Sequence, residues 1–126
     1  MRGIDAAAAR EWRERGSLRD IGDHRIFVVE GGDPAAPPLL LLHGFPTSSL
    51  DWLPIWDGLC ARYRVIAFDF LGFGYSAKPP RHRYDLMEQA DIAAGIVRAS
   101  GCDAVHLLAH DYGVSVAQEL LARSRD

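Results

Sequence analysis

One strand-to-helix junction restricts the fold more than any other feature of this chain. An apolar run at residues 104–109 predicts a strand, and residues 114–121 have the spacing of a helix. The short turn between them needs small residues on both sides of its central position, and Ala109 and Gly113 meet that need. The central position holds Asp111. The junction is therefore typical of a nucleophile elbow that carries a carboxylate.

A carboxylate at such a turn indicates covalent chemistry. Asp111 would attack carbon and form an ester, and the partial positive charge at the N-terminus of the following helix would keep it ionised. Two alternatives stay open at this stage. Residues 113–117 also match G-x-S-x-A, which would make Ser115 the nucleophile of an esterase but leave about nine residues for the helix. Asp111 could also serve only as a helix N-cap.

A second strand ends in a loop that contains glycine and proline. Residues 39–42 are four leucines, the pattern of a strand buried on both faces. They are followed by His43, Gly44, Phe45 and Pro46. We expect the backbone N–H groups of Phe45 and Tyr112 to form an oxyanion hole, which stabilises charge on the carboxyl oxygen during ester hydrolysis. The Phe45–Pro46 bond is a candidate cis peptide.

A third strand, predicted at residues 64–68, leads into the segment D-x-x-G-x-G-x-S from Asp69 to Ser76. With Ala77 this segment also matches the G-x-G-x-x-A pattern of a dinucleotide-binding turn. That pattern requires a helix to begin at the glycines, and two prolines that follow prevent a helix there. We therefore expect no dinucleotide cofactor, and we expect Asp69 and Ser76 to hold the loop by local hydrogen bonds.

The remaining pattern is one of alternating strands and helices. Trp12 is the expected apolar anchor of a first, surface helix that ends at Gly16. The predicted helices cover residues 5–15, 52–62, 86–99 and 114–121, and the predicted strands cover 18–21, 25–30, 39–42, 64–68 and 104–109. Alternation after an initial hairpin predicts a parallel α/β sheet with right-handed crossovers. We assign residues 1–16 to an N-terminal helix and residues 17–126 to a core domain.

Composition limits the classes of partner. The chain has 126 residues, 48% hydrophobic and 25% charged, which suits a globular core. A net charge of −3 gives no electrostatic reason to expect nucleic-acid binding, and no segment is long enough to predict a membrane span or a signal peptide. A cytoplasmic location is the expectation. Cys60 and Cys102 match no metal or redox spacing, so we expect both to pack as small apolar groups and expect no metal site.

The five histidines divide by their predicted surroundings. His43 and His110 flank the oxyanion glycine and the nucleophile, and we expect them to form hydrogen bonds with the loops around the elbow rather than to act as bases. His24 and His82 are expected in loops. His106 lies within a predicted strand and is interpreted as an ordinary histidine with satisfied hydrogen bonds.

The ordered motifs resemble a known family. The segments at residues 43–46, 69–76 and 110–113, in this order and spacing, are similar to the α/β-hydrolase superfamily in its epoxide-hydrolase and haloalkane-dehalogenase branch. The resemblance covers roughly residues 24–123. It implies the α/β-hydrolase fold, a small-molecule substrate and no cofactor. It also implies Asp111 as nucleophile, Phe45 and Tyr112 as oxyanion-hole donors, and supporting roles for His43, Gly44, Pro46, His110 and Gly113.

Two positions depart from the family pattern. Haloalkane dehalogenases place a tryptophan after the nucleophile to hold the leaving halide, and Tyr112 stands there in this chain. Dehalogenation is therefore disfavoured. A second small residue often follows the glycine of the elbow, and the β-branched Val114 at that position is expected to crowd the packing of the helix on the sheet.

The resemblance also has a consequence for length. The family fold is about twice as long, and its cap domain, further strands, catalytic acid and histidine base follow the elbow. The expectation is an N-terminal half of an α/β-hydrolase fold that is inactive alone and pairs with a C-terminal half or with itself. The competing hypothesis is a non-catalytic truncated fragment, or one half of a split enzyme that binds its partner.

Overall fold

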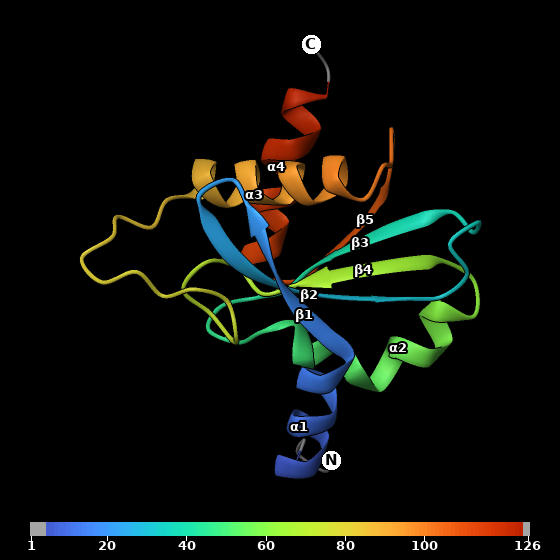
Figure 1. The fold of residues 1–126 in the computed structure, drawn as a ribbon. Helices are drawn as coiled ribbons and strands as arrows, with labels where there is room; N and C mark the ends of the chain where they lie inside the picture. The colour runs from blue at the N-terminus through green and yellow to red at the C-terminus, as the bar shows by residue number, and fades with distance from the viewer. Residues whose placement is uncertain (1–4, 125–126) are drawn as a thin grey trace.

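One mixed sheet organises the chain in this computed structural model, which describes residues 5–124 (Figure 1). The strands are β1 (Gly16–Ile21), β2 (His24–Gly31), β3 (Pro38–Leu42), β4 (Arg64–Phe68) and β5 (His106–Ala109). Their order across the sheet is β1-β2-β4-β3-β5. β1, β2 and β4 pair antiparallel, whereas β3 pairs parallel with both β4 and β5. The prediction of initial antiparallel strands followed by parallel strands is confirmed.

Helices cover both faces of this sheet. They are α1 (Ala6–Arg15), the 3₁₀ helix η1 (Ser49–Trp52), α2 (Leu53–Cys60), α3 (Leu86–Ala99) and α4 (Tyr112–Arg123). α3 and α4 lie on one side of the sheet, and α1 and α2 lie on the other (Figure 1). Two helices begin at an aspartate cap: Asp5 accepts a hydrogen bond from Ala8 N, and Asp85 accepts one from Glu88 N, each at 2.8 Å.

Two apolar layers hold these helices on the sheet. Leu40 and Leu42 of β3 face the layer under α3 and α4, whereas Leu39 and Leu41 face the layer under α1 and α2. The four-leucine run is therefore buried on both faces, as the sequence predicts. Trp12 anchors α1 in the second layer and is 1% exposed.

Several predicted bounds differ from the observed ones. Residues 49–52 form a 3₁₀ turn, and α2 begins beside Pro54, whose fixed φ suits a first helical turn. β5 begins at His106 instead of residue 104, because its partner β3 begins at Pro38, which has no N–H to donate, and the pairing starts one residue later. His24 is the first residue of β2 and not a loop residue.

The position of each parallel strand sets its exposure. β4 lies inside the sheet and its last four residues are buried, whereas β5 lies at an edge and its four residues are exposed or half-buried. Among residues 5–124, no helix is both long and apolar enough to cross a bilayer. The segments assigned from the sequence, residues 1–16 and 17–126, also include residues 1–4 and 125–126. Those six residues lie outside the described residues.

Candidate active site

The elbow joins β5 to α4 through two residues, His110 and Asp111. Asp111 has φ 56° and ψ −119°, a backbone conformation that is costly for any residue other than glycine. Strained residues of this kind concentrate at functional sites. Asp111 is also solvent-exposed, so its carboxylate can be reached by a reactant.

Two glycines make room for this turn. A Cβ atom on Gly113 would lie 2.2 Å from the carbonyl oxygen of Leu42, where α4 begins against the end of β3. A Cβ atom on Gly44 would lie 2.8 Å from the Cβ atom of Asp111. Both distances are too short for real side chains, so glycine is required for the loop after β3 and the elbow to approach each other.

The carboxylate of Asp111 is bound by the loop that follows β3. The backbone N–H of Phe45 donates a hydrogen bond to Oδ1 of Asp111 at 3.1 Å. This N–H and that of Tyr112 hold the pKa of the Asp111 carboxyl below its usual value, and the nearby His110 lowers the pKa further. Of the two groups expected to form the oxyanion hole, Phe45 N–H binds the carboxylate directly, and Tyr112 N–H contributes to its lowered pKa. The peptide bond between Phe45 and Pro46 is cis, as the sequence suggests.

The two alternative interpretations of the elbow find less support. The side chain of Asp111 makes no capping hydrogen bond to the first turn of α4, so the N-cap interpretation lacks its defining contact. Ser115 lies within α4, after the helix has begun at Tyr112, and not at the strand-to-helix turn. Val114 is 43% exposed, so the crowding of α4 against the sheet expected for this residue is not observed.

His43 connects the loop after β3 to the loop after β4. Its Nε2 accepts a hydrogen bond from the backbone N–H of Phe70 at 3.0 Å, so the ring proton lies on Nδ1, which donates to the carbonyl of Gly44 at 2.8 Å. Burial lowers the pKa of His43 and favours its neutral form. Both ring nitrogens are occupied, as expected for a histidine that holds loops and does not act as a base.

His110 supports the elbow through its backbone. Its N–H donates to the carbonyl of Leu42 at 3.1 Å, and its own carbonyl accepts from Gly113 N at 2.9 Å. The expected side-chain hydrogen bond is not found among residues 5–124, and His110 is exposed. His106 is exposed on β5 and packs edge-on against Tyr63.

The loop after β4 is held as the sequence predicts. Oδ1 of Asp69 accepts from Ser49 N and Oδ2 accepts from Tyr75 N, both at 2.8 Å. The hydroxyl of Ser76 donates to the backbone carbonyl of Asp69 at 2.6 Å and accepts from Phe27 N at 2.9 Å. The interpretation of Asp69 and Ser76 as residues that fix the loop is confirmed.

Two features of this region escape sequence reasoning. The buried amide of Gln89 pairs with both backbone groups of Leu71, at 3.1 and 2.9 Å, and so joins α3 to the same loop. His24, His82 and Glu88 converge from three separate segments, although the sequence predicts no metal ligands. Neither feature has a signal in the local sequence. Gln89 is 18 residues from Leu71, and His24 is 64 residues from Glu88.

Comparisons with known proteins agree with this geometry. A family model described as the alpha/beta hydrolase fold matches residues 37–126. The mesoderm-specific transcript protein of Mus musculus is 47% identical over 92% of this chain, which spans 36% of that protein. LipZ of Mycobacterium tuberculosis, named as a candidate hydrolase, is 45% identical over 98% of this chain, which spans 42% of that protein. The motifs at residues 43–49, 69–74 and 110–113 predict a resemblance to the mesoderm-specific transcript protein and to bacterial relatives.

A solved structure extends the comparison to three dimensions. A loop variant of the haloalkane dehalogenase DbeA from Bradyrhizobium elkanii superposes with a TM-score of 0.80 at 33% identity. The superposition covers 86% of this chain and 35% of the dehalogenase chain. The chain thus spans well under half the length of the proteins it matches, and the matched part contains the elbow and the loops around it.

Proposed function

The chain belongs to the α/β-hydrolase family, and we propose that Asp111 is its catalytic nucleophile in an epoxide-hydrolase-like reaction. One observation carries the proposal. Asp111 occupies the strained position of the elbow, and its Oδ1 already accepts a hydrogen bond from Phe45 N. A serine esterase would need a hydroxyl at this position instead.

In the first step, a carboxylate oxygen of Asp111 attacks an electrophilic carbon of the substrate. A new carbon–oxygen bond forms, the carbon–oxygen bond of the epoxide breaks, and its electron pair moves to the leaving oxygen, which takes up a proton from water. The product is an ester between Asp111 and the substrate. The lowered pKa of the Asp111 carboxyl keeps it ionised for this step at neutral pH.

In the second step, water attacks the carboxyl carbon of that ester. Negative charge develops on the carboxyl oxygen that is not bonded to substrate, and the N–H groups of Phe45 and Tyr112 stabilise it. Oδ1 already lies 3.1 Å from Phe45 N, so this stabilisation needs little rearrangement. The tetrahedral intermediate then releases the alcohol and restores the carboxylate.

The base that removes a proton from water is not His43, because both of its nitrogens are engaged inside the protein. We assign no base among residues 5–124. The chain spans 36% of its mesoderm-specific transcript relative, so turnover is proposed for the whole protein. We propose that residues 1–126 alone form the ester and do not turn over, because a base must lie within hydrogen-bond reach of the water.

The position after the nucleophile bears on the leaving group. Tyr112 has no indole N–H with which to hold a halide, so we propose an epoxide in preference to a haloalkane. The substrate itself would be selected by parts of the protein outside residues 5–124.

Two matched variants test the nucleophile. With styrene oxide as the probe and the whole protein, of which this chain is a part, as the enzyme, Asp111→Ala should lower kcat by several orders of magnitude, whereas Ser115→Ala should retain most activity. Circular dichroism of both variants controls for folding. Loss of activity in Ser115→Ala together with its survival in Asp111→Ala would overturn the proposal and favour a serine nucleophile.

A further inference from the structure

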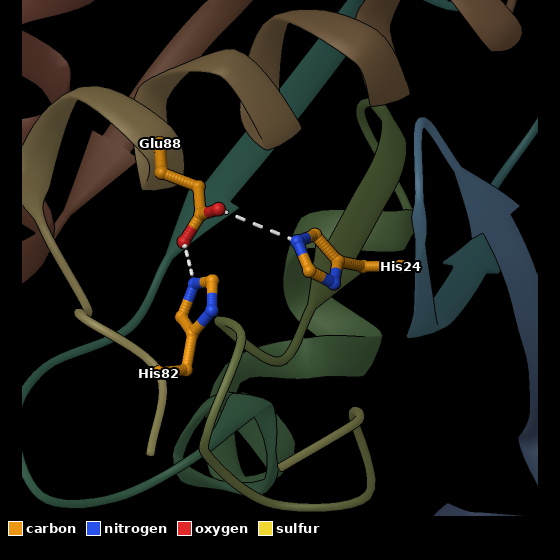
Figure 2. A group of neighbouring side chains, drawn as sticks. All are labelled: His24, His82 and Glu88. Carbon is orange, nitrogen blue, oxygen red and sulfur yellow. Dashed lines mark hydrogen bonds and ion pairs between the residues drawn. The ribbon is translucent and has the colours of Figure 1, made fainter. Parts of the chain in front are cut away.

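Three polar side chains outside the elbow converge on one point. His24 begins β2, Glu88 lies in the first turn of α3, and His82 lies in the loop before that helix. Figure 2 shows both imidazole rings directed at the carboxylate of Glu88. Nε2 of His82 lies 2.6 Å from Oε1, and Nε2 of His24 lies 3.3 Å from Oε2. The sequence-based expectation of no metal site did not anticipate this group.

We propose that His24, His82 and Glu88 bind a divalent transition-metal ion of the zinc type. One ligand atom from each residue lies within 4.8 Å of the other two. Zinc binds imidazole nitrogen and carboxylate oxygen at about 2.0–2.2 Å, so tetrahedral ligand atoms are separated by about 3–3.5 Å. The present group needs only small side-chain rotations to reach that spacing.

The donor set favours zinc over the hard cations. Two imidazoles and one carboxylate suit zinc and its first-row neighbours, whereas magnesium and calcium prefer an all-oxygen shell. Three protein ligands leave the fourth position of zinc for water or a further carboxylate.

The surroundings give an ion access while holding the ligands in place. The three side chains are 21–27% exposed. A cavity of about 290 Å³ opens beside two of them, His24 and Glu88, and is also lined by Asp23, Asp91 and Arg98. Asp91 is paired with Arg123 at 2.7 Å, whereas Asp23 has no ion pair among residues 5–124. The ring of His82 packs between those of Tyr84 and His24, with centroid distances of 4.9 and 5.6 Å.

A metal ion here would fasten three segments together. It would tie the β1–β2 hairpin to α3 and to the loop that precedes α3. Val28 of β2 pairs antiparallel with Phe68 at the end of β4, so the start of β2 extends past the carboxyl ends of the parallel strands. The site therefore lies at the same end of the sheet as the elbow, namely the end at which the parallel strands have their carboxyl termini. We assign the ion a structural role, independent of the chemistry at Asp111.

Zinc titration of the full chain tests the site. After treatment with a chelator, isothermal titration calorimetry should show one zinc ion bound per chain, with a Tm that rises with zinc concentration. His82→Ala and Glu88→Gln should each weaken binding by about 100-fold or more, since even the loss of a residue behind the ligands costs about 10- to 100-fold. His106→Ala, which removes an exposed histidine on β5, is the matched control and should bind zinc like the wild type.

Other results would overturn the site. Absence of saturable binding would mean that Glu88 simply accepts hydrogen bonds from two imidazoles. Equal binding by wild type, His82→Ala and Glu88→Gln would place any bound zinc elsewhere. If a variant unfolds, X-ray absorption of the zinc-loaded wild type decides: two imidazole nitrogens and a carboxylate oxygen support the site, and a shell containing cysteine sulfur contradicts it.

Discussion

Asp69 and Asp111 occupy equivalent places in the topology and have opposite surroundings. Each follows the carboxyl end of a parallel strand, β4 and β5, and these two strands flank β3. Asp69 is 1% exposed, and both of its carboxylate oxygens accept backbone hydrogen bonds from loops on either side. Asp111 is exposed, strained, and bound through Oδ1 by Phe45.

The difference shows how one residue type serves two purposes at one edge of a sheet. A buried carboxylate with every oxygen occupied organises its loop and offers no oxygen for reaction. An exposed carboxylate beside two N–H donors remains ionised and accessible. Each aspartate also lies against one glycine, Gly74 beside Asp69 and Gly44 beside Asp111.

The largest expected effect separates activity from stability at Asp111. Asp111→Asn should lower kcat by about 10⁴-fold or more, because the amide is a poor nucleophile. Its Tm should stay near that of the wild type, since asparagine tolerates positive φ and the residue is exposed. Steady-state kinetics and differential scanning calorimetry measure the two quantities. A large fall in Tm with full activity would reverse the assignment of the two aspartates.

Asp69→Asn should give the opposite result. The amide NH₂ would face one of the backbone donors, Ser49 N or Tyr75 N, and leave a buried donor unsatisfied. We expect the free energy of unfolding to fall by about 2–4 kcal/mol. Urea unfolding measures it, and an unchanged midpoint would show that Asp69 does not organise the loop.

Gly44 and Gly74, which lie against the two aspartates, allow the two loops to be tested separately. In Gly44→Ala the new Cβ would displace Asp111 or the Phe45 N–H, and a shift of about 1 Å should lower kcat by about 10²-fold. In Gly74→Ala the new Cβ would meet Oδ2 of Asp69 at a residue with φ 52°, so stability should fall by about 1–3 kcal/mol.

Gly58→Ala is the control for both glycine variants. A Cβ atom there meets nothing within 4 Å, and the residue lies inside α2. Alanine should stabilise the helix by up to about 1 kcal/mol. Activity loss in Gly74→Ala equal to that in Gly44→Ala would contradict the division between the two loops.

A smaller effect is expected on the pH dependence of folding stability. The pKa of the Asp111 carboxyl is lowered in the folded state, chiefly by Phe45 N–H. Its ionised form therefore adds to stability above the unfolded pKa, and this contribution is lost as pH falls through the lower folded pKa. Carbon-13 NMR of the Asp111 carboxyl should titrate below the usual aspartate range. Titration above that range would contradict the hydrogen bond from Phe45.

The sequence predicts the elements whose local pattern is strong. The bounds of α3 and β4 are predicted to the residue, because α3 has an aspartate cap and a regular apolar face, and β4 is a continuous apolar run. The roles of Asp69 and Ser76 also follow from their spacing in one loop. The contacts of Asp111, Phe45 and Gly44 agree with the motif, although their catalytic roles stay proposals.

Long-range partners explain what the sequence does not predict. The amide of Gln89 resembles any polar residue of a helix until the fold brings Leu71 beside it. His24 is a local case, because its strand partner Ile21 is only three residues away and the predicted strand begins one residue too late, at residue 25. The start of β5 depends on where β3 begins, which residues 104–109 do not encode.

Oxygen labelling shows whether Asp111 forms a covalent ester with the substrate. The whole protein, in excess over styrene oxide, is allowed a single turnover in ¹⁸O-labelled water, and the oxygen label is located by mass spectrometry. If Asp111 forms the ester, ¹⁸O enters the peptide containing Asp111 while the diol gains its new oxygen from the protein. Label that enters the diol directly, with none in the Asp111 peptide, would contradict it.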